Sequence, residues 1–248
     1  LFMLAAGFGF YLLAGEYTRN RWLRLGGAFM FSILPWCFPV SRSTMSGYTP
    51  MLLGLVLGWH FTFRAVATRR PLFAFAAAFF WAFAAYSHNC GRLASAFCVL
   101  GACVALLPLA KKRLRPLSWV CLASILLVVP IVLSYVFHPE YMGRMGQVSI
   151  LRDGVSLSEA LRQAATNYLG YFDPRFLFVS GDSNLRHNSG FGELFVFMLP
   201  LVAIGVWRAA MSFRHDFRSR FLLVGLLLAP LIASATVNPM HSTRSLNA

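Results

Sequence analysis

Four short polar stretches carry the residues whose types could do chemistry. Each lies at the end of a long apolar run: Ser41-Arg42, Tyr86 to Arg92, Tyr171 to His187, and Asn238 to Arg244. A guanidinium offers forked N–H donors that match phosphate oxygens, and a neighbouring histidine, tyrosine or carboxylate can add a proton donor or acceptor. The candidate substrate- or phosphate-binding residues are therefore Arg186, His187, Asp182, Arg92, Tyr86, Arg244, His241, Arg42 and Arg175.

Each of these residues also has a plainer interpretation. Arginines at a membrane interface commonly anchor helices by snorkelling, and for any single arginine this is the more frequent role. Arg186 is the exception for which we favour function, because Asp182 and His187 cluster beside it without an obvious structural duty. Asp173-Pro174 is typical of a turn, although Asp173 could also act as a base or a metal ligand. Glu193 could interact with a helix N-terminus or face a cavity.

A metal or another cofactor has little support in the sequence. His187, Asp182 and His241 could together bind a divalent ion, but their spacing matches no metal-ligand pattern. No glycine-rich nucleotide-binding loop is present, and no catalytic residue can be assigned.

The composition indicates that lipid is the solvent for most of the chain. Of its 248 residues, 58% are hydrophobic and 12% are charged, whereas soluble domains are about 45–50% apolar and about 25% charged. Irregular backbone cannot face lipid, so the spanning elements must be helices. The sequence predicts an all-α membrane protein.

A spanning helix needs about 20 mostly apolar residues, and eight segments fit, some only loosely. They are Leu1–Gly15, Trp22–Val40, Pro50–Val66, Pro71–Ser87, Leu93–Ala110, Leu117–Phe137, Phe191–Ala210 and Phe221–Val237. The organisation that follows is six transmembrane helices in 1–137, one long loop in 138–190, and two further helices with the start of another loop in 191–248.

The basic residues predict the orientation of these segments. The net charge is +14, and the loops after segments one, three, five and seven hold 14 of the 22 Lys and Arg residues. Cytoplasmic loops carry the excess of positive charge, so the chain is predicted to be a multi-pass protein of the cell membrane, specifically a bacterial inner membrane, with loop 138–190 on the extracytoplasmic side. The clusters thus indicate topology, and a nucleic acid partner is not expected.

The long loop contains one helix signature. Ser156 followed by Glu159 forms a capping box, and apolar residues then recur at helical spacing as far as Phe172. The expected amphipathic helix either lies on the outer membrane surface or packs on the rest of the loop.

The order of these features resembles the GT-C type of membrane glycosyltransferases, which includes dolichyl-phosphate-mannose protein mannosyltransferases and the lipid A aminoarabinose transferase. The stretches that carry the resemblance are Pro35-Trp36 with Ser41-Arg42, Tyr86-Ser87-His88-Asn89 with Arg92, Phe172 to His187, and Asn238 to Asn247. It spans nearly the whole chain, and its motifs are moderately specific.

The resemblance implies transfer of a hexose or pentose from a polyprenyl-phosphate donor to an acceptor on the extracytoplasmic face, where the acceptor is a lipid, a glycan or a protein. It also implies an acidic catalytic residue in an outer loop that would precede Leu1, so the chain is expected to be a fragment without that residue. Two alternatives stay open: a transporter or flippase of lipid-linked glycans, and a ligase or polymerase of surface polysaccharide.

Overall fold

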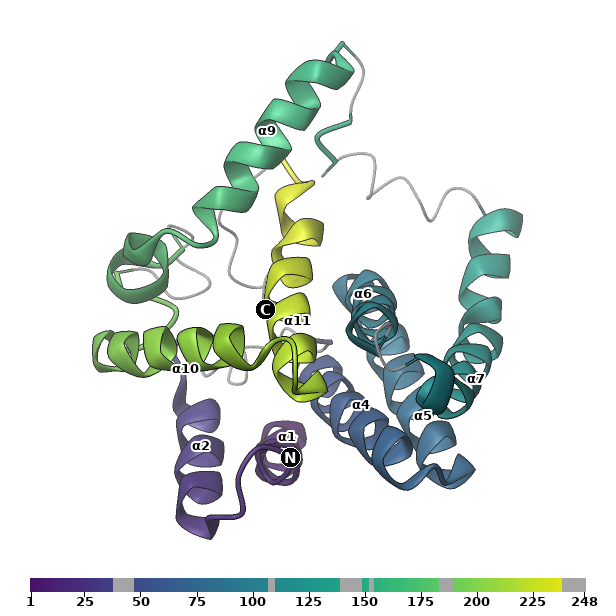
Figure 1. Ribbon diagram of the computed structural model, residues 1–248. Coiled ribbons are helices and arrows are strands. Elements are labelled where there is room, and N and C mark those ends of the chain that lie inside the picture. Colours follow the sequence, from purple (N-terminus) through teal and green to yellow (C-terminus); the bar gives the residue numbers. More distant parts are fainter. Residues whose placement is uncertain (38–46, 107–109, 139–148, 152–153, 183–189, 238–248) are drawn as a thin grey trace.

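The computed structural model describes residues 1–37, 47–106, 110–138, 149–151, 154–182 and 190–237, and these residues fold almost entirely into helices (Figure 1). The helices are α1 (Phe2–Ala14), α2 (Arg21–Ile33), α4 (Tyr48–Thr68), α5 (Pro71–Ser87), α6 (Asn89–Leu106), α7 (Ala110–Phe137), α9 (Leu157–Gly170), α10 (Leu199–Ser212) and α11 (Phe217–Ser234), with a π-helical turn η3 (Phe176–Ser180) and a 3-10 turn η4 (Val196–Met198). Within the described ranges the one β-type pairing is an isolated bridge between Ser149 and Thr236. The predicted all-α class is confirmed.

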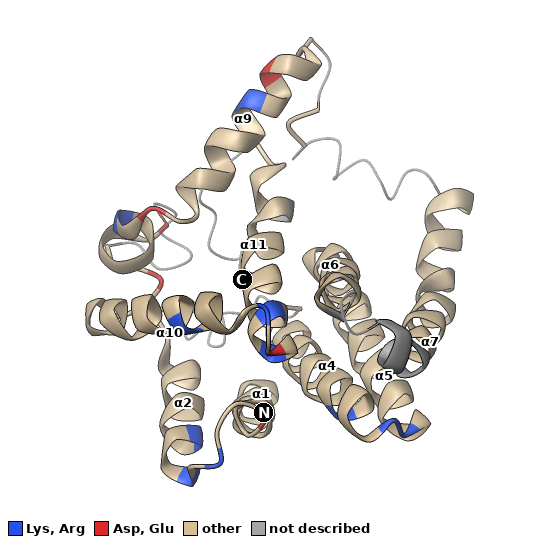
Figure 2. Cartoon of the chain, in the orientation of Figure 1, with Lys and Arg blue, Asp and Glu red and all other residues tan. Residues whose placement is uncertain are grey.

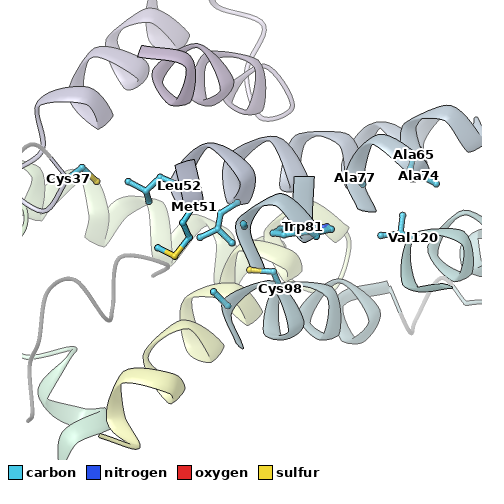
Figure 3. Close-up of a cluster of buried hydrophobic side chains, with 12 residues drawn as sticks. Cys37, Met51, Leu52, Ala65, Ala74, Ala77, Trp81, Cys98 and Val120 are labelled. Atoms are coloured by element: carbon cyan, nitrogen blue, oxygen red, sulfur yellow. The ribbon is translucent and has the colours of Figure 1, made fainter. Parts of the chain in front are cut away.

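The core forms where α4 crosses α5 at close range. A Cβ atom at Gly54 would lie 2.7 Å from the backbone nitrogen of Ala84 and 2.8 Å from the carbonyl oxygen of Phe80. The Trp81 indole N–H donates to Thr62 Oγ1 at 3.2 Å, and both side chains are buried. Figure 3 shows the cluster around this crossing, with Trp81 near its centre and Cys37 at one end.

Helix α11 returns from the far end of the chain to complete this core. The Phe221 ring lies between Trp59 and Phe63, with ring-centroid separations of 3.7 and 5.0 Å. Gly225, one turn further along α11, leaves room for the Trp59 indole, because a Cβ atom there would come within 2.7 Å of it. Helix α11 therefore packs in one bundle with α4 and α6, and α1 packs against α4.

The arginine-rich ends of several helices lie together in this bundle. The Tyr17 ring, just after α1, and the Phe217 ring, at the start of α11, each have their centroid 5.7 Å from that of Phe63, near the end of α4. At the same end, Glu16 is nine-tenths buried, 3.5 Å from His60 Nδ1 and 3.6 Å from an Arg218 Nη. Figure 2 shows Lys and Arg at the start of α2, between α4 and α5, and at the start of α11.

The structure corrects the bounds of several predicted segments. Helix α2 ends at Ile33 and does not continue to Val40, because Leu34 precedes Pro35 and adopts an extended ψ of 135°. The segment predicted from Phe191 becomes helical only at η4 and α10, since the preceding residues serve loop contacts described below. Helix α7 begins at Ala110, earlier than predicted. Only Pro71–Ser87 matches the expected bounds at both ends.

Length and composition distinguish two of the described helices. Tyr48–Thr68 and Ser118–Phe137 are long and apolar enough to cross a membrane, with mean hydropathies of 1.3 and 2.7. Four apolar helical stretches are shorter: Phe2–Ala14, Pro71–Ser87, Asn89–Ala105 and Val196–Ser212. The total of eight spans thus stays a prediction.

The helix predicted in the long loop is present as α9. Ser156 Oγ accepts a hydrogen bond from the Glu159 backbone N–H at 3.3 Å, so the predicted N-terminal cap forms. Ala160 and Asn167 are buried on one face, whereas Leu157, Leu161 and Leu169 are each more than 60% exposed. Asn167 and Tyr168 donate hydrogen bonds to the carbonyls of Ser234 and Leu227, so α9 packs against α11.

Candidate functional site

Four of the nine predicted site residues fall within the described part of the chain: Tyr86, Arg92, Arg175 and Asp182. The other five lie outside the described residues: Arg42, Arg186, His187, His241 and Arg244. The described four lie on different elements, Tyr86 and Arg92 at the ends of α5 and α6 and Arg175 and Asp182 on either side of η3.

The first group, Tyr86 and Arg92, lies against α7. Tyr86, at the end of α5, donates its hydroxyl to the backbone carbonyl of Leu127 at 3.0 Å. The Arg92 guanidinium carbon, at the start of α6, lies 5.1 Å from the centroid of the Tyr135 ring. These two contact points on α7 are about 12 Å apart, since a helix rises about 1.5 Å per residue. Contacts of α5 and α6 with α7 therefore position the Tyr86 hydroxyl and the Arg92 guanidinium.

Arg92 is the more informative of the two residues. Its Nε atom is buried and has no hydrogen-bond partner, and none of the described carboxylates forms an ion pair with it. A guanidinium that has lost water at one N–H and gained only an aromatic ring retains unused capacity to bind an anion. The arrangement suits a phosphate oxygen that approaches along α7.

The second group, Arg175 and Asp182, flanks the π-helical turn η3. The Asp173 carboxylate accepts a hydrogen bond from the Arg175 backbone N–H at 2.8 Å, as in the predicted turn. Arg175 itself is exposed. After η3 the chain reverses at Gly181, whose φ of 59° with ψ of −152° favours glycine. Asp182 follows at once and is buried, with 5% of its surface exposed.

Glu193 holds this second group in place through a loop contact and not through the helix N-terminus considered for it from the sequence. Its Oε1 atom accepts the Asp182 backbone N–H at 3.1 Å, and the side chain is fully buried. It does not lie at a helix N-terminus, because η4 begins only at Val196. Its backbone carbonyl accepts the Trp36 N–H at 3.1 Å. Glu193 thus joins the segment after α2 to the segment after η3.

Two backbone contacts reinforce the junction at Glu193. The Leu194 N–H donates to the Leu177 carbonyl at 2.7 Å. Gly192 lies directly against the backbone of Phe178, where a Cβ atom would collide. The one sequence signal for this assembly is an acidic residue, with a glycine before it, at the border between a polar loop and an apolar run.

Asn167 fixes the outer end of α11 in a similar way. Its Nδ2 group donates to the carbonyls of Ser234 and Thr236, both at 3.1 Å. The Ile150 N–H donates to the Ala235 carbonyl between them, also at 3.1 Å. The last carbonyls of a helix lack intrahelical partners, so these contacts satisfy them. They determine where the chain leaves α11 toward residues 238–248, which carry His241 and Arg244.

Replacing Asn167 with alanine should lower the free energy of unfolding by about 1–2 kcal/mol, because the buried Ser234 carbonyl and the half-buried Thr236 carbonyl lose their donor. Thermal unfolding in detergent, followed by the amount of monodisperse protein, measures this effect. Thr166→Ala is the matched control, since that exposed hydroxyl donates only to Arg162 within its own helix. Equal stability of the two variants would contradict the role given to Asn167.

No group of three metal-binding side chains occurs among the residues that the structure describes. Of the three residues considered for a divalent ion, His187 and His241 lie outside that part of the chain. The third, Asp182, donates its backbone N–H to Glu193 Oε1.

Comparison with known proteins identifies no relative: no family model, no curated protein and no solved structure matches the chain.

Proposed function

We propose that the chain is a multi-pass membrane protein that binds a lipid-linked phosphate at the extracytoplasmic end of its helix bundle. We further propose that it serves a glycosyltransferase reaction with a polyprenyl-phosphate sugar as donor. The observation that carries the proposal is Arg92, whose buried Nε has no hydrogen-bond partner and whose guanidinium lies beside Tyr135 on α7.

The surface of α7 supports a lipid environment for this site. Ile125, Leu126, Val132, Leu133 and Val136 are each between 46% and 67% exposed on this helix. Such a face is stable in contact with hydrocarbon and unfavourable in water. A polyprenyl chain beside α7 would meet the same apolar side chains as a membrane lipid, while its phosphate would reach the level of Arg92.

The shared end of α1, α4 and α11 supports the proposed orientation and the eight spans. Figure 2 shows basic residues at the start of α2, between α4 and α5, and at the start of α11, in connections that the positive-inside rule would make cytoplasmic. At the opposite ends of these helices lie Tyr86 in α5, Arg92 in α6 and Glu193 before α10. Asn167 of α9 contacts the corresponding end of α11. Loop 138–190, with α9, then faces the extracytoplasmic side.

The proposed reaction places a fixed positive charge where negative charge develops. The acceptor hydroxyl oxygen bonds to the anomeric carbon as the bond from that carbon to the phosphate oxygen breaks. The lipid phosphate leaves with the electron pair, and the hydroxyl proton passes to a carboxylate. Arg92, together with arginines of the segments outside the described residues, would stabilise the departing phosphate.

Arg92→Ala should weaken binding of a polyprenyl phosphate by about 10- to 100-fold, because a charge-assisted hydrogen bond contributes about 1.5–3 kcal/mol. The measurement is titration of the purified protein in nanodiscs with a polyprenyl phosphate. Arg162→Ala, an exposed arginine on α9, is the matched control and should bind as the wild type does.

A neutral polyprenol of the same length is a second control, because it shows how much of the binding depends on the phosphate and how much on the hydrocarbon tail. The polyprenol should bind weakly to wild type and Arg92→Ala alike. If Arg92→Ala binds the phosphate as tightly as wild type, the site assignment is wrong. Translocation of a labelled lipid-linked sugar across vesicles without any transferred product would favour the flippase over the transferase.

A further inference from the structure

Two cysteine sulfurs meet across the interface between α6 and α7. Cys103 Sγ and Cys121 Sγ are 3.5 Å apart, and both residues are partly exposed. Both are free thiols, as are the other three cysteines. Cys37 and Cys98, by contrast, are buried in the core cluster. The proposed lipid-phosphate site makes no use of the Cys103–Cys121 contact.

The pair lies at the opposite end of the α6–α7 interface from the candidate phosphate site. Arg92 contacts Tyr135 near the start of α6 and the end of α7, whereas Cys103 contacts Cys121 near the end of α6 and in the first half of α7. The two helices are therefore antiparallel. A disulfide between Cys103 and Cys121 would join α6 to α7 at one end of their interface, and the Arg92 guanidinium lies at the other end.

The distance that must close is small. A disulfide has its sulfurs about 2 Å apart, so the two atoms must approach by about 1.5 Å. Helix α7 can supply that movement, because Leu122, Ile125 and Leu126 are each more than half exposed, so few protein contacts restrain that face of the helix. Rotation of either cysteine about its Cα–Cβ bond would supply part of it.

We propose that Cys103 and Cys121 form a reversible dithiol–disulfide couple that ties α6 to α7. With a peroxide as oxidant, one thiolate attacks a peroxide oxygen, the O–O bond breaks, and a sulfenic acid and one water result. The second thiol then attacks the sulfenic sulfur, the S–S bond forms and a second water leaves. Two electrons pass from the thiols to the peroxide, and a small thiol reverses the step by exchange.

The proposed orientation gives the couple a regulatory character. Cys103 and Cys121 lie in the cytoplasmic half of their helices, and the cytosol keeps thiols reduced except in transient, redox-sensing disulfides. Oxidation would restrain α7. This helix provides the Leu127 carbonyl that accepts the Tyr86 hydroxyl and the Tyr135 ring beside Arg92. This consequence for phosphate binding rests on the proposed function, whereas formation of the disulfide does not.

The test treats reduced, purified protein in nanodiscs with hydrogen peroxide and maps its peptides by mass spectrometry. The expected product is a single cross-link between the peptides of Cys103 and Cys121, lighter by two hydrogen atoms and reversed by dithiothreitol. Cys103→Ser should abolish the cross-link, and Cys98→Ser, in the neighbouring turns of α6, should leave it unchanged.

Three outcomes would overturn the proposal: no cross-link in the wild type, a cross-link that involves Cys37, Cys90 or Cys98 instead, or higher oxidation of Cys103 and Cys121 without a bond between them. Titration of oxidised and reduced protein with polyprenyl phosphate then tests the functional consequence separately. A cross-link that forms without altering this titration would leave the thiol couple in place and remove only its link to the phosphate site.

Discussion

Replacing Glu193 with leucine should lower the free energy of unfolding by about 3 kcal/mol, or the melting temperature by about 10 °C. Leucine has a similar volume but no acceptor, so the buried Asp182 N–H loses its partner at 3.1 Å. An unmade buried hydrogen bond costs more than a made one contributes, because the freed group is not rehydrated. Thermal unfolding of the purified protein in detergent measures the loss.

Glu193→Gln is the matched control for this variant. Glutamine keeps an oxygen at the Oε1 position and can accept the same N–H, so it should retain most of the stability. Limited proteolysis should also cut Glu193→Leu faster within 176–182, where η3 and Asp182 lose their anchor, and leave Glu193→Gln protected. If the leucine variant is as stable as the glutamine variant, Glu193 does not hold this segment.

Replacing Gly54 with alanine should cost about 2–3 kcal/mol, although alanine is the better helix former. The added methyl carbon would lie 2.7 Å from the Ala84 nitrogen and 2.8 Å from the Phe80 carbonyl oxygen. Both are backbone atoms of α5, so neither can turn aside, and α4 and α5 must separate. Thermal unfolding of the purified protein in detergent measures the loss.

Gly205→Ala serves as the control, since it makes the same substitution inside a helix where nothing lies within 4 Å of the new atom. It should stabilise the protein by about 0.5–1 kcal/mol, because alanine restricts the unfolded chain. The two variants thus have opposite expected signs. A loss of stability in Gly205→Ala that equals the loss in Gly54→Ala would mean that close packing at the α4–α5 crossing is not the cause.

The junction at Glu193 bears directly on the proposed site. Trp36, from the first stretch that suggested the transferase resemblance, and Asp182, from the longest of them, both contact Glu193. Asn167 contacts the C-terminal end of α11. Tyr86 and Arg92 join α7 through separate contacts. These contacts connect segments that are far apart in sequence.

Local chemistry let the sequence determine much of the fold. Hydrophobic runs predicted an all-helical chain, since only helices satisfy their own backbone in an apolar setting. The capping box at Ser156 and Glu159 predicted the start of α9, and Asp173-Pro174 predicted a turn, because each signal acts between residues at most three positions apart. Arg70 and Pro71 marked the start of α5 for the same reason, as proline suits the first turn of a helix.

Only the tertiary structure decided which residues meet. The late start of α10 accompanies the backbone contact between the segment after α2, at Trp36, and the segment before α10, at Glu193, which are far apart in the chain. No periodicity in either segment encodes that contact. The same holds for Arg92 with Tyr135 and for Cys103 with Cys121. A hydrophobic pattern specifies that a helix face is buried, but the partner of a given side chain depends on how several helices pack at once.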